Sequence, residues 1–288
     1  MMMHNNISKP PWLRVRLPAT PEFAKVVKTL SGLRLNTVCV SARCPNIFEC
    51  FSRKKATFMI LGSSCSRNCG FCAVSKDPPE TVDHNEPQKI SEAVSILGLR
   101  HIVLTSVTRD DLKDGGALHF ARVLNRLGRD HQEATLEVLV PDFGGRLQSI
   151  DRVLESGPHV FGHNLETVSR LYLRARPQAD YRTSLQILQY VSDAAPEVPV
   201  KTGIMAGLGE SDAEILQALE DIAGSGCKAV TVGQYLRPSR SSLEVRRYVP
   251  PEKFTEYEEA GIKLGLVMSC GPLIRSSYRA ESLGLRRS

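Results

Sequence analysis

The sequence predicts an α/β fold, an incomplete (β/α)6 TIM-type barrel with an N-terminal and a C-terminal extension. From about residue 56 to residue 264, segments rich in β-branched and apolar residues alternate with segments of helical period. Six strand candidates lie in this span, and each precedes a helix candidate, which is typical of repeated βαβ units. A full eight-unit barrel takes about 250 residues, so six units indicate a parallel barrel that is open on one side.

The strand candidates follow one another at the spacing that parallel strands with crossover helices require. In chain order they are residues 56–62, 101–107, 135–143, 160–166, 199–209 and 229–236. The crossovers should be right-handed. In barrels of this kind the chemistry lies at the C-terminal ends of the strands, so the segments that follow the strands are where functional residues are expected.

The helix candidates carry apolar stripes that predict packing against the sheet. The first places four residues on one face: Ile90, Ala93, Val94 and Leu97. Another begins with Ser211 and Glu214 at the spacing of a capping box. In the N-terminal extension, Thr20 and Pro21 predict the start of a short helix.

Composition sets the outer limits of domain organisation and partners. The 288 residues are 42% hydrophobic and 24% charged, enough for one large core. We expect an N-terminal extension over residues 1–55, the partial barrel over 56–266 and a C-terminal tail over 267–288. The net charge of +6 is spread along the chain and aromatic residues make up only 6%, so nucleic acid is not an expected partner.

Nothing in the sequence predicts a membrane span or a secretion signal. No apolar run approaches the roughly 18 residues that a spanning helix needs. The first ten residues contain no apolar stretch of signal-peptide length. The cytoplasm is therefore the expected compartment.

Six of the eight cysteines fall within 34 positions, as two sets of three. The first triplet is Cys39, Cys44 and Cys50, and the second triplet is Cys65, Cys69 and Cys72. A cubane 4Fe-4S cluster usually takes four thiolates, so a set of three leaves one iron open to another ligand. Open metal positions usually indicate chemistry rather than structure.

Disulfides and structural zinc are the alternative explanations for these cysteines. Disulfide-dense folds are mostly small and secreted, which does not fit this chain. Structural zinc normally wants four Cys or His ligands in paired C-x2-C units, and only Cys69 and Cys72 have that spacing. The second triplet also begins just beyond the end of the first strand candidate, which is the catalytic end of a barrel. The pattern therefore favours iron–sulfur chemistry.

The segment from Cys65 to Cys72, with Phe71 before the last cysteine, resembles the cluster loop of radical S-adenosylmethionine enzymes. The resemblance implies a 4Fe-4S cluster whose unique iron is chelated by S-adenosylmethionine. One electron then cleaves the sulfonium and yields a 5'-deoxyadenosyl radical that abstracts hydrogen from an unactivated carbon. The cofactor carries this step, and the protein supplies position and exclusion of water.

The sequence around the first triplet, residues 37–52, is similar to that of the lipoyl synthase family. Further similarities occur in order along the chain, at residues 11–18, 56–62, 105–117, 137–143, 163–167, 203–210, 233–236 and 275–280. One departure is Arg279, which stands where many members have histidine. It removes no expected cluster ligand.

The family resemblance implies a sulfurtransferase that inserts two sulfur atoms at C6 and C8 of a protein-bound octanoyl-lysine. The first triplet would bind an auxiliary 4Fe-4S cluster as the sulfur source, with Ser277 as its serine ligand and Ser276 as the less favoured candidate. Expected partners are octanoylated lipoyl-carrier domains, namely 2-oxoacid dehydrogenase E2 subunits and the glycine cleavage H protein. A flavodoxin or ferredoxin would supply electrons.

Five further residues are candidates for contacts with the cofactor or substrate. Gly115 and Gly116 follow the second strand, where glycine would permit close approach to the methionyl group, but the same pair is equally typical of a turn that opens a helix. Glu137, Asn164 and Lys201 lie on later strands and could point inward, or they could be solvated strand ends.

Two other functional classes remain open at this stage. One is an electron carrier that uses both clusters for transfer only, which would form no 5'-deoxyadenosine. The other is a different twin-cluster radical enzyme, such as a relative of biotin synthase or of the methylthiotransferases. Product analysis on an octanoylated carrier peptide separates these from sulfur insertion.

Overall fold

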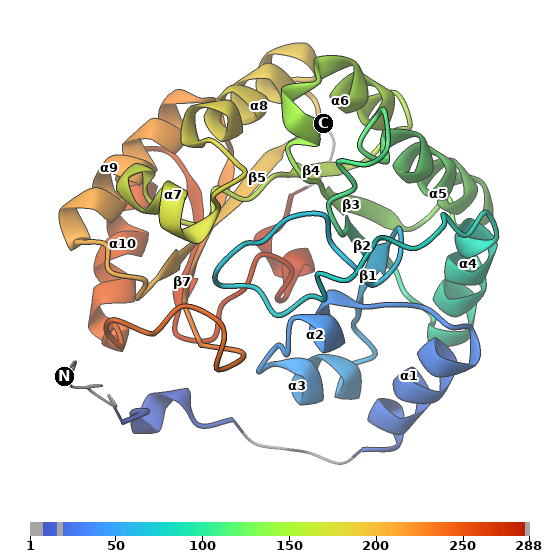
Figure 1. Ribbon diagram of the computed structural model, residues 1–288, viewed down its shortest axis with the longest axis horizontal. Helices are drawn as coiled ribbons and strands as arrows, with labels where there is room; N and C mark the ends of the chain where they lie inside the picture. Colours follow the sequence, from blue (N-terminus) through green and yellow to red (C-terminus); the bar gives the residue numbers. More distant parts are fainter. Residues whose placement is uncertain (1–7, 16–19, 286–288) are drawn as a thin grey trace.

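The computed structural model describes residues 8–15 and 20–285. Residues 1–7, 16–19 and 286–288, which belong to the two predicted extensions, lie outside the described part. The described chain forms a curved sheet at the centre, with helices around its outer side (Figure 1). The predicted α/β partial barrel is confirmed.

Seven parallel strands form the sheet, in the order of the chain. They are β1 (Thr57–Ile60), β2 (His101–Ser106), β3 (Thr135–Leu139), β4 (Val160–Gly162), β5 (Val200–Ala206), β6 (Ala229–Gln234) and β7 (Val267–Gly271). Strands β1 to β6 are almost wholly buried, because helices cover their outer face and the barrel interior covers the other. Their C-terminal ends therefore meet at one edge.

Six longer helices form the outer layer, and each packs an apolar stripe inward. They are α4 (Glu86–Leu97), α5 (Ala117–Asp130), α6 (Leu147–Leu154), α8 (Tyr181–Ala194), α9 (Asp212–Gly224) and α10 (Pro251–Lys263). The predicted stripe on α4 is at most 4% exposed at each of its four positions. The predicted capping box of α9 is also present, with the Glu214 amide donating to Ser211 Oγ and the Ser211 amide donating to Glu214.

Strand β7 corrects the prediction of six strands and of a tail that begins at residue 267. Its five residues pair in parallel with β6, from Ala229 with Val267 to Gly233 with Gly271. The strand lies at the sheet edge and its side chains are partly exposed. No α-helix follows it in the described chain, so it does not complete a strand–helix unit like the other six. The tail, as the term is used below, comprises residues 272–285.

The sheet ends at β1 and β7, so the barrel is open between them. The N-terminal helices α1 (Pro21–Gly32), α2 (Val38–Ser41) and α3 (Ile47–Ser52) lie on this side (Figure 1). Thr20 caps α1 by accepting a hydrogen bond from the Phe23 amide at 3.2 Å, as predicted. Asn46 Nδ2 donates to the Leu273 carbonyl at 2.6 Å, so the N-terminal extension and the tail meet at the opening.

Short helical elements complete the connections. Helix α7 (Tyr172–Ala175) follows β4, and the 3-10 turns η2 (Phe143–Gly145) and η4 (Ala280–Leu283) lie after β3 and in the tail. Two further 3-10 turns are η1 (Pro11–Leu13), near the start of the described chain, and η3 (Ser169–Leu171), directly before α7. Within the described ranges, no helix has both the length and the apolar character needed to cross a membrane.

Candidate active site

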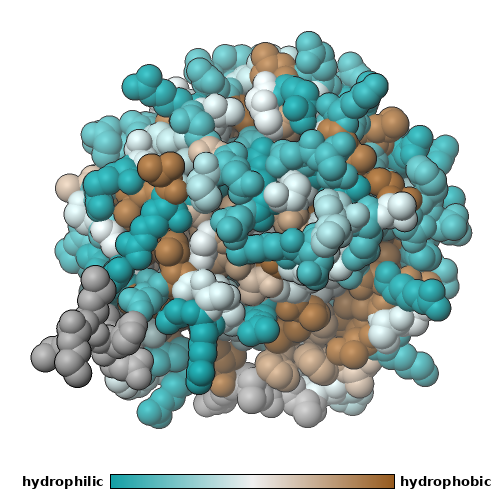
Figure 2. Space-filling view, viewed as in Figure 1, coloured by the Kyte–Doolittle hydropathy of each residue, from teal (hydrophilic) through white to brown (hydrophobic). Residues whose placement is uncertain are grey.

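A cavity of about 350 Å³ lies at the C-terminal ends of the strands, and all six clustered cysteines line it. The thiols come from two separate parts of the chain, because the first triplet lies on and between α2 and α3 and the second follows β1. Figure 2 shows this face, where hydrophilic side chains surround neutral and hydrophobic ones near the centre and over α1 to α3. The fold thus brings both triplets to one cavity, called the large cavity below.

The second triplet lies on a loop whose backbone donates hydrogen bonds to its sulfurs. Cys65 Sγ accepts from the Thr108 amide at 3.3 Å and from the Arg67 amide at 3.5 Å. Cys72 Sγ accepts from the Val74 amide at 3.4 Å. Amide donors stabilise negative charge on sulfur, so this loop is suited to hold thiolates.

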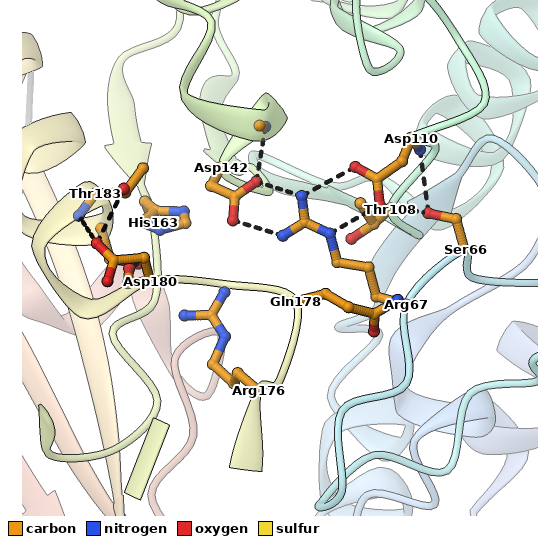
Figure 3. A network of polar contacts seen from close by, with 12 residues as sticks. Ser66, Arg67, Thr108, Asp110, Asp142, His163, Arg176, Gln178, Asp180 and Thr183 are labelled. Atoms are coloured by element: carbon orange, nitrogen blue, oxygen red, sulfur yellow. Dashed lines mark hydrogen bonds and ion pairs between the residues drawn. The ribbon is translucent and has the colours of Figure 1, made fainter. Parts of the chain in front are cut away.

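Arg67, near the middle of this loop, anchors the loop to the barrel (Figure 3). Its guanidinium donates to both carboxylate oxygens of Asp142, at 2.5 and 2.7 Å, and to those of Asp110, at 2.8 and 2.9 Å. Asp142 follows β3 and Asp110 follows β2, so the loop is tied to two strand ends. Burial would raise the pKa of Asp142, but the hydrogen bonds from Arg67 outweigh it and the pKa is lowered.

The first triplet lies on short helical turns at the barrel opening. Cys39 is in α2, which Thr37 caps by accepting from the Val40 amide at 3.3 Å. Cys50 is in α3, and the Cys44 amide donates to the Cys39 carbonyl at 3.0 Å. Burial raises the pKa of Cys39 to about 11, and burial together with the other two thiols raises the pKa of Cys50 to about 12. A metal would therefore have to displace protons from these thiols.

The donor set fits iron–sulfur clusters. All eight cysteines are free, and six of them surround the large cavity. Among the described residues, no three or more His, Cys, Asp or Glu side chains converge closely enough for one metal ion. Thiols spread around a cavity suit a group of several metal atoms, which takes one ligand per iron.

The tail brings two neighbouring hydroxyls, those of Ser276 and Ser277, to the large cavity on a segment of turns. Ser276 Oγ donates to Asn164 Oδ1 at 2.9 Å, and Asn164 Nδ2 donates to Glu166 Oε1 at 3.0 Å. Ser277 lines the large cavity and also a smaller pocket of about 40 Å³, which Cys39 and Cys50 border as well. Ser276 is therefore bound to the segment that follows β4, whereas Ser277 lies among residues of the first triplet.

The predicted cofactor-contact residues fall into two groups. Phe71 and Asn164 line the large cavity. Glu137 and Lys201 do not, because Lys201 Nζ donates to Glu137 Oε1 at 2.7 Å inside the barrel, where both side chains are at most 4% exposed. His101 Nε2 lies 2.9 Å from the other oxygen of Glu137. The two residues that were expected to face a ligand thus face each other.

The glycine pair forms the turn that opens α5, the second of the two interpretations that the sequence left open. Gly115 and Gly116 have φ angles of 64° and 94°, and Asp114 accepts from the Gly116 amide at 3.0 Å. A Cβ at Gly116 would lie 2.3 Å from Leu61 Cδ1, so the glycine is needed for packing. Neither glycine lines the large cavity.

Sequence reasoning missed several residues that do line the large cavity. Four of them follow directly along the end of β2: Thr105, Ser106, Val107 and Thr108. Glu166, with φ of 68°, and Arg176, whose Nη1 donates to the Asn164 carbonyl at 3.0 Å, lie on the opposite wall. Burial raises the pKa of Glu166, against the effect of Arg176. The polar run that starts at Thr105, directly before the glycine pair, is the sequence signal for this wall.

His163 is the other residue missed, and it is the least exposed polar side chain of the cavity wall described here. It is 1% exposed, and its Nδ1 lies 2.9 Å from the Val140 carbonyl, which requires Nδ1 to carry the proton. Its Nε2 has no hydrogen-bond partner among the described residues. Burial and the Arg176 charge lower the pKa of His163 to about 4, so the ring is neutral.

Comparisons with known proteins agree with this arrangement. A sequence profile for the radical SAM superfamily matches residues 59–222, and a profile for the N-terminal domain of lipoyl synthase matches residues 3–44. The lipoyl synthase of Caldanaerobacter subterraneus subsp. tengcongensis is 50% identical over 96% of both chains. That of Alkaliphilus metalliredigens is 48% identical over 94% of both.

Solved structures show the same fold at low identity. The hydrogenase maturase HydG matches with a TM-score of 0.58 at 15% identity, over 80% of this chain and 54% of that one. Methylornithine synthase matches with a TM-score of 0.55 at 13% identity, over 73% of this chain and 62% of that one. With half of its residues identical to full-length curated relatives, the chain belongs to the lipoyl synthase family of the radical S-adenosylmethionine superfamily.

Proposed function

We propose that this enzyme inserts two sulfur atoms, at C6 and C8, into an octanoyl chain carried on a protein lysine, and so forms a lipoyl group. The observation that carries the proposal is the single cavity of about 350 Å³ that both cysteine triplets line. Sulfur insertion needs a radical generator and a sulfur source within reach of one carbon chain. A cavity shared by both triplets meets that requirement.

The second triplet would hold the 4Fe-4S cluster that binds S-adenosylmethionine. When bound, this pair supplies the hydrogen-abstracting chemistry that no protein side chain can provide. The amides of Thr108, Arg67 and Val74 hold the sulfurs in place by hydrogen bonds. Arg67 keeps the loop against β2 and β3 through Asp110 and Asp142.

Contacts to S-adenosylmethionine would come from both walls of the large cavity. On one wall, the end of β2 offers Ser106 and the backbone around it. On the other, Asn164 and Glu166 offer an amide and a carboxylate at the end of β4. Phe71, between Cys69 and Cys72, offers an apolar surface beside the loop. Glu137, Lys201, Gly115 and Gly116 have no part in this proposal, because they do not line the cavity.

The first triplet, with Ser277, would hold the auxiliary 4Fe-4S cluster, which is consumed as the sulfur substrate. Three thiols and one hydroxyl from the tail then make up four ligands. A serine oxygen is harder and more basic than a thiolate, so its bond to iron is more easily protonated and lost. Such a ligand suits a cluster that must release sulfur.

The partners and the compartment follow from the same proposal. The protein substrate would be an octanoylated lipoyl-carrier domain, either an E2 subunit of a 2-oxoacid dehydrogenase or the glycine cleavage H protein. A flavodoxin or ferredoxin would deliver the electron. The cytoplasm is the proposed compartment, supported by the free state of all eight cysteines.

Mass analysis of an octanoylated carrier peptide tests the proposed function. The anaerobically reconstituted enzyme is incubated with the peptide, S-adenosylmethionine and a reductant. The expected product gains two sulfurs in place of two hydrogens, and 5'-deoxyadenosine forms alongside. Formation of 5'-deoxyadenosine without sulfur gain would indicate a different radical enzyme, and formation of neither would favour an electron carrier.

A further inference from the structure

We propose that Glu49 is a positioning residue that holds the tail, and with it Ser277, against the first triplet. One carboxylate in α3 binds two consecutive side chains of the tail that are more than 200 positions away in the sequence. Tyr278 Oη donates to both oxygens of Glu49, at 3.0 Å each, and Arg279 Nη2 donates to Oε1 at 2.8 Å. The inference rests on the proposed function for the identity of the metal at this site.

The contacts of Glu49 join two segments that each carry an expected cluster ligand. Glu49 precedes Cys50, and Tyr278 follows Ser277. A bifurcated hydrogen bond from Tyr278 and a second one from Arg279, both to one ionised carboxylate, therefore connect the peptide next to a thiol ligand with the peptide next to the hydroxyl ligand. Hydrogen bonds to a charged acceptor are stronger than neutral ones, so the connection resists separation of the two segments.

The backbone of the tail is bent to make these contacts. Arg279 has φ of 49° and ψ of 40°, a left-handed conformation that is unfavourable for a residue with a Cβ. The bend turns the Arg279 guanidinium back over the Tyr278 ring, at 5.1 Å from its centre, and toward Glu49. A strained residue persists only where surrounding contacts hold it, and the Glu49 carboxylate supplies them.

The smaller pocket of the site lies beside the Glu49 contacts and the first triplet. Its volume is about 40 Å³, room for little more than ordered water. The pocket is lined by Cys39, Cys50 and Ser277. It is also lined by the three residues that make the contacts, Glu49, Tyr278 and Arg279. The Glu49 contacts thus line the same pocket as Ser277 and two thiols of the first triplet.

Other contacts also hold the tail, among them the 2.9 Å hydrogen bond from Ser276, next to Ser277, to Asn164 beyond β4, but none of them accepts from both Tyr278 and Arg279. The Lys55–Glu281 ion pair is 3.2 Å long, with side chains 40% and 42% exposed, and exposed pairs contribute little. Asn46 binds the Leu273 carbonyl, four residues before Ser277. The Arg279–Glu49 pair is itself partly exposed, at 48% and 36%, so the hydrogen bond from Tyr278 is needed alongside it. Glu49 is the acceptor of both.

The decisive variant is Glu49→Gln, which keeps the shape of the side chain and removes its charge. The matched control is Glu214→Gln, because Glu214 also binds an arginine, Arg170, at 2.7 Å but lies on α9, away from the site. Both are reconstituted anaerobically, and the release of iron to a ferrous chelator is followed with Mössbauer spectra. Glu49→Gln should lose one iron of the auxiliary cluster about tenfold faster, the effect expected for weakening charge-assisted hydrogen bonds, and Glu214→Gln should match the wild type.

A double-mutant comparison separates positioning of Ser277 from general support of the fold. Ser277→Ala removes the hydroxyl, so adding Glu49→Gln to it should leave the rate of iron release unchanged. The inference would be overturned if Glu49→Gln accelerated iron release equally in the wild-type and Ser277→Ala backgrounds. It would also be overturned if Glu49→Gln alone released iron at the wild-type rate. A wild type that holds only one cluster would instead contradict the proposed function.

A second measurement needs no cluster at all. In the metal-free protein, trypsin should cleave the tail after Arg275 and Arg279 about tenfold faster in Glu49→Gln than in Glu214→Gln, because the tail is released more often. Mass spectrometry identifies the cleavage sites. Equal cleavage of the two variants would contradict the inference even if Glu49→Gln takes up no iron.

Discussion

The Arg67 guanidinium and the Asp142 carboxylate form two parallel hydrogen bonds, at 2.5 and 2.7 Å, across 75 positions of sequence. Arg67 lies in the loop of the second triplet, and Asp142 lies three residues beyond the end of β3. Both side chains are less than one-tenth exposed. The pair is therefore a buried link between the cluster loop and the barrel, and removal of Arg67 would leave the Asp142 carboxylate as an uncompensated buried charge.

Arg67→Met should destabilise the metal-free protein by about 3 kcal/mol, because it leaves Asp142 buried without its partner. The same variant should form much less 5'-deoxyadenosine, since the loop loses its anchor. Urea unfolding and product analysis measure the two effects. Arg170→Met is the control, because the Arg170–Glu214 pair is exposed and should contribute less than about 1 kcal/mol. Equal effects of the two variants would show that burial of the Arg67 pair is immaterial.

The pH dependence of stability should carry a contribution from His163. Burial lowers its pKa from 6.5 to about 4 in the folded protein, whereas the unfolded chain keeps the ordinary value. Below pH 6.5 the unfolded chain binds a proton that the folded protein does not, so stability falls as pH drops and the loss levels off near pH 4. The full loss is about 3 kcal/mol, from 1.36 kcal/mol for each pKa unit.

The comparison that isolates this effect is wild type against His163→Gln, unfolded in urea at pH 7 and pH 4.5. Carboxylates titrate in both proteins, so their contribution cancels in the difference. The wild type should lose more stability than the variant over this interval. Parallel losses would mean that His163 is not held neutral by burial.

The buried pair of Glu137 and Lys201 should matter for stability and not for S-adenosylmethionine binding. Glu137→Gln alone leaves the Lys201 ammonium buried without its counter-charge and should cost about 3 to 5 kcal/mol. Glu137→Leu combined with Lys201→Met removes both charges and should recover much of that loss. Calorimetric titration of S-adenosylmethionine into the reconstituted double variant should give the wild-type affinity, and a large loss of affinity would restore these residues to the cofactor site.

The two serines of the tail should differ in what they support. Ser276→Ala loses one hydrogen bond to Asn164, worth about 1 kcal/mol, and should keep both clusters. Ser277→Ala should keep the fold but lose iron from the auxiliary cluster and the ability to insert sulfur. Iron content and carrier-peptide mass report both. If the two variants behaved in the opposite way, Ser276 would be the ligand.

The parts of the fold that could be predicted are those with a local signal. The six inner strands are buried on both sides and appear as apolar runs, and each cysteine triplet lies within a short segment. Strand β7 was missed because no α-helix follows it in the part of the chain that the structure describes, so it does not complete a strand–helix unit. The strand ends were also placed too late, since the apolar residues that follow them line the cavity instead of extending the sheet.

The site was harder to predict because it depends on pairs that are distant in sequence. Glu137 and Lys201 are each polar residues on a strand, and nothing local shows that they neutralise each other across 64 positions. The glycine pair had two acceptable interpretations, and its φ angles of 64° and 94° at the start of α5 support the turn. The contact of Glu49 with the tail has no sequence signal beyond its position next to Cys50.

The iron content of the wild type and of Cys39→Ala/Cys44→Ala/Cys50→Ala, reconstituted anaerobically and followed by Mössbauer spectra, tests the central claim most directly. The claim is that two independent clusters share one cavity, one for radical generation and one as sulfur source. It predicts two clusters in the wild type and one in the variant, which should still form 5'-deoxyadenosine but insert no sulfur. One cluster in both proteins would contradict it, because the first triplet would then hold no sulfur source.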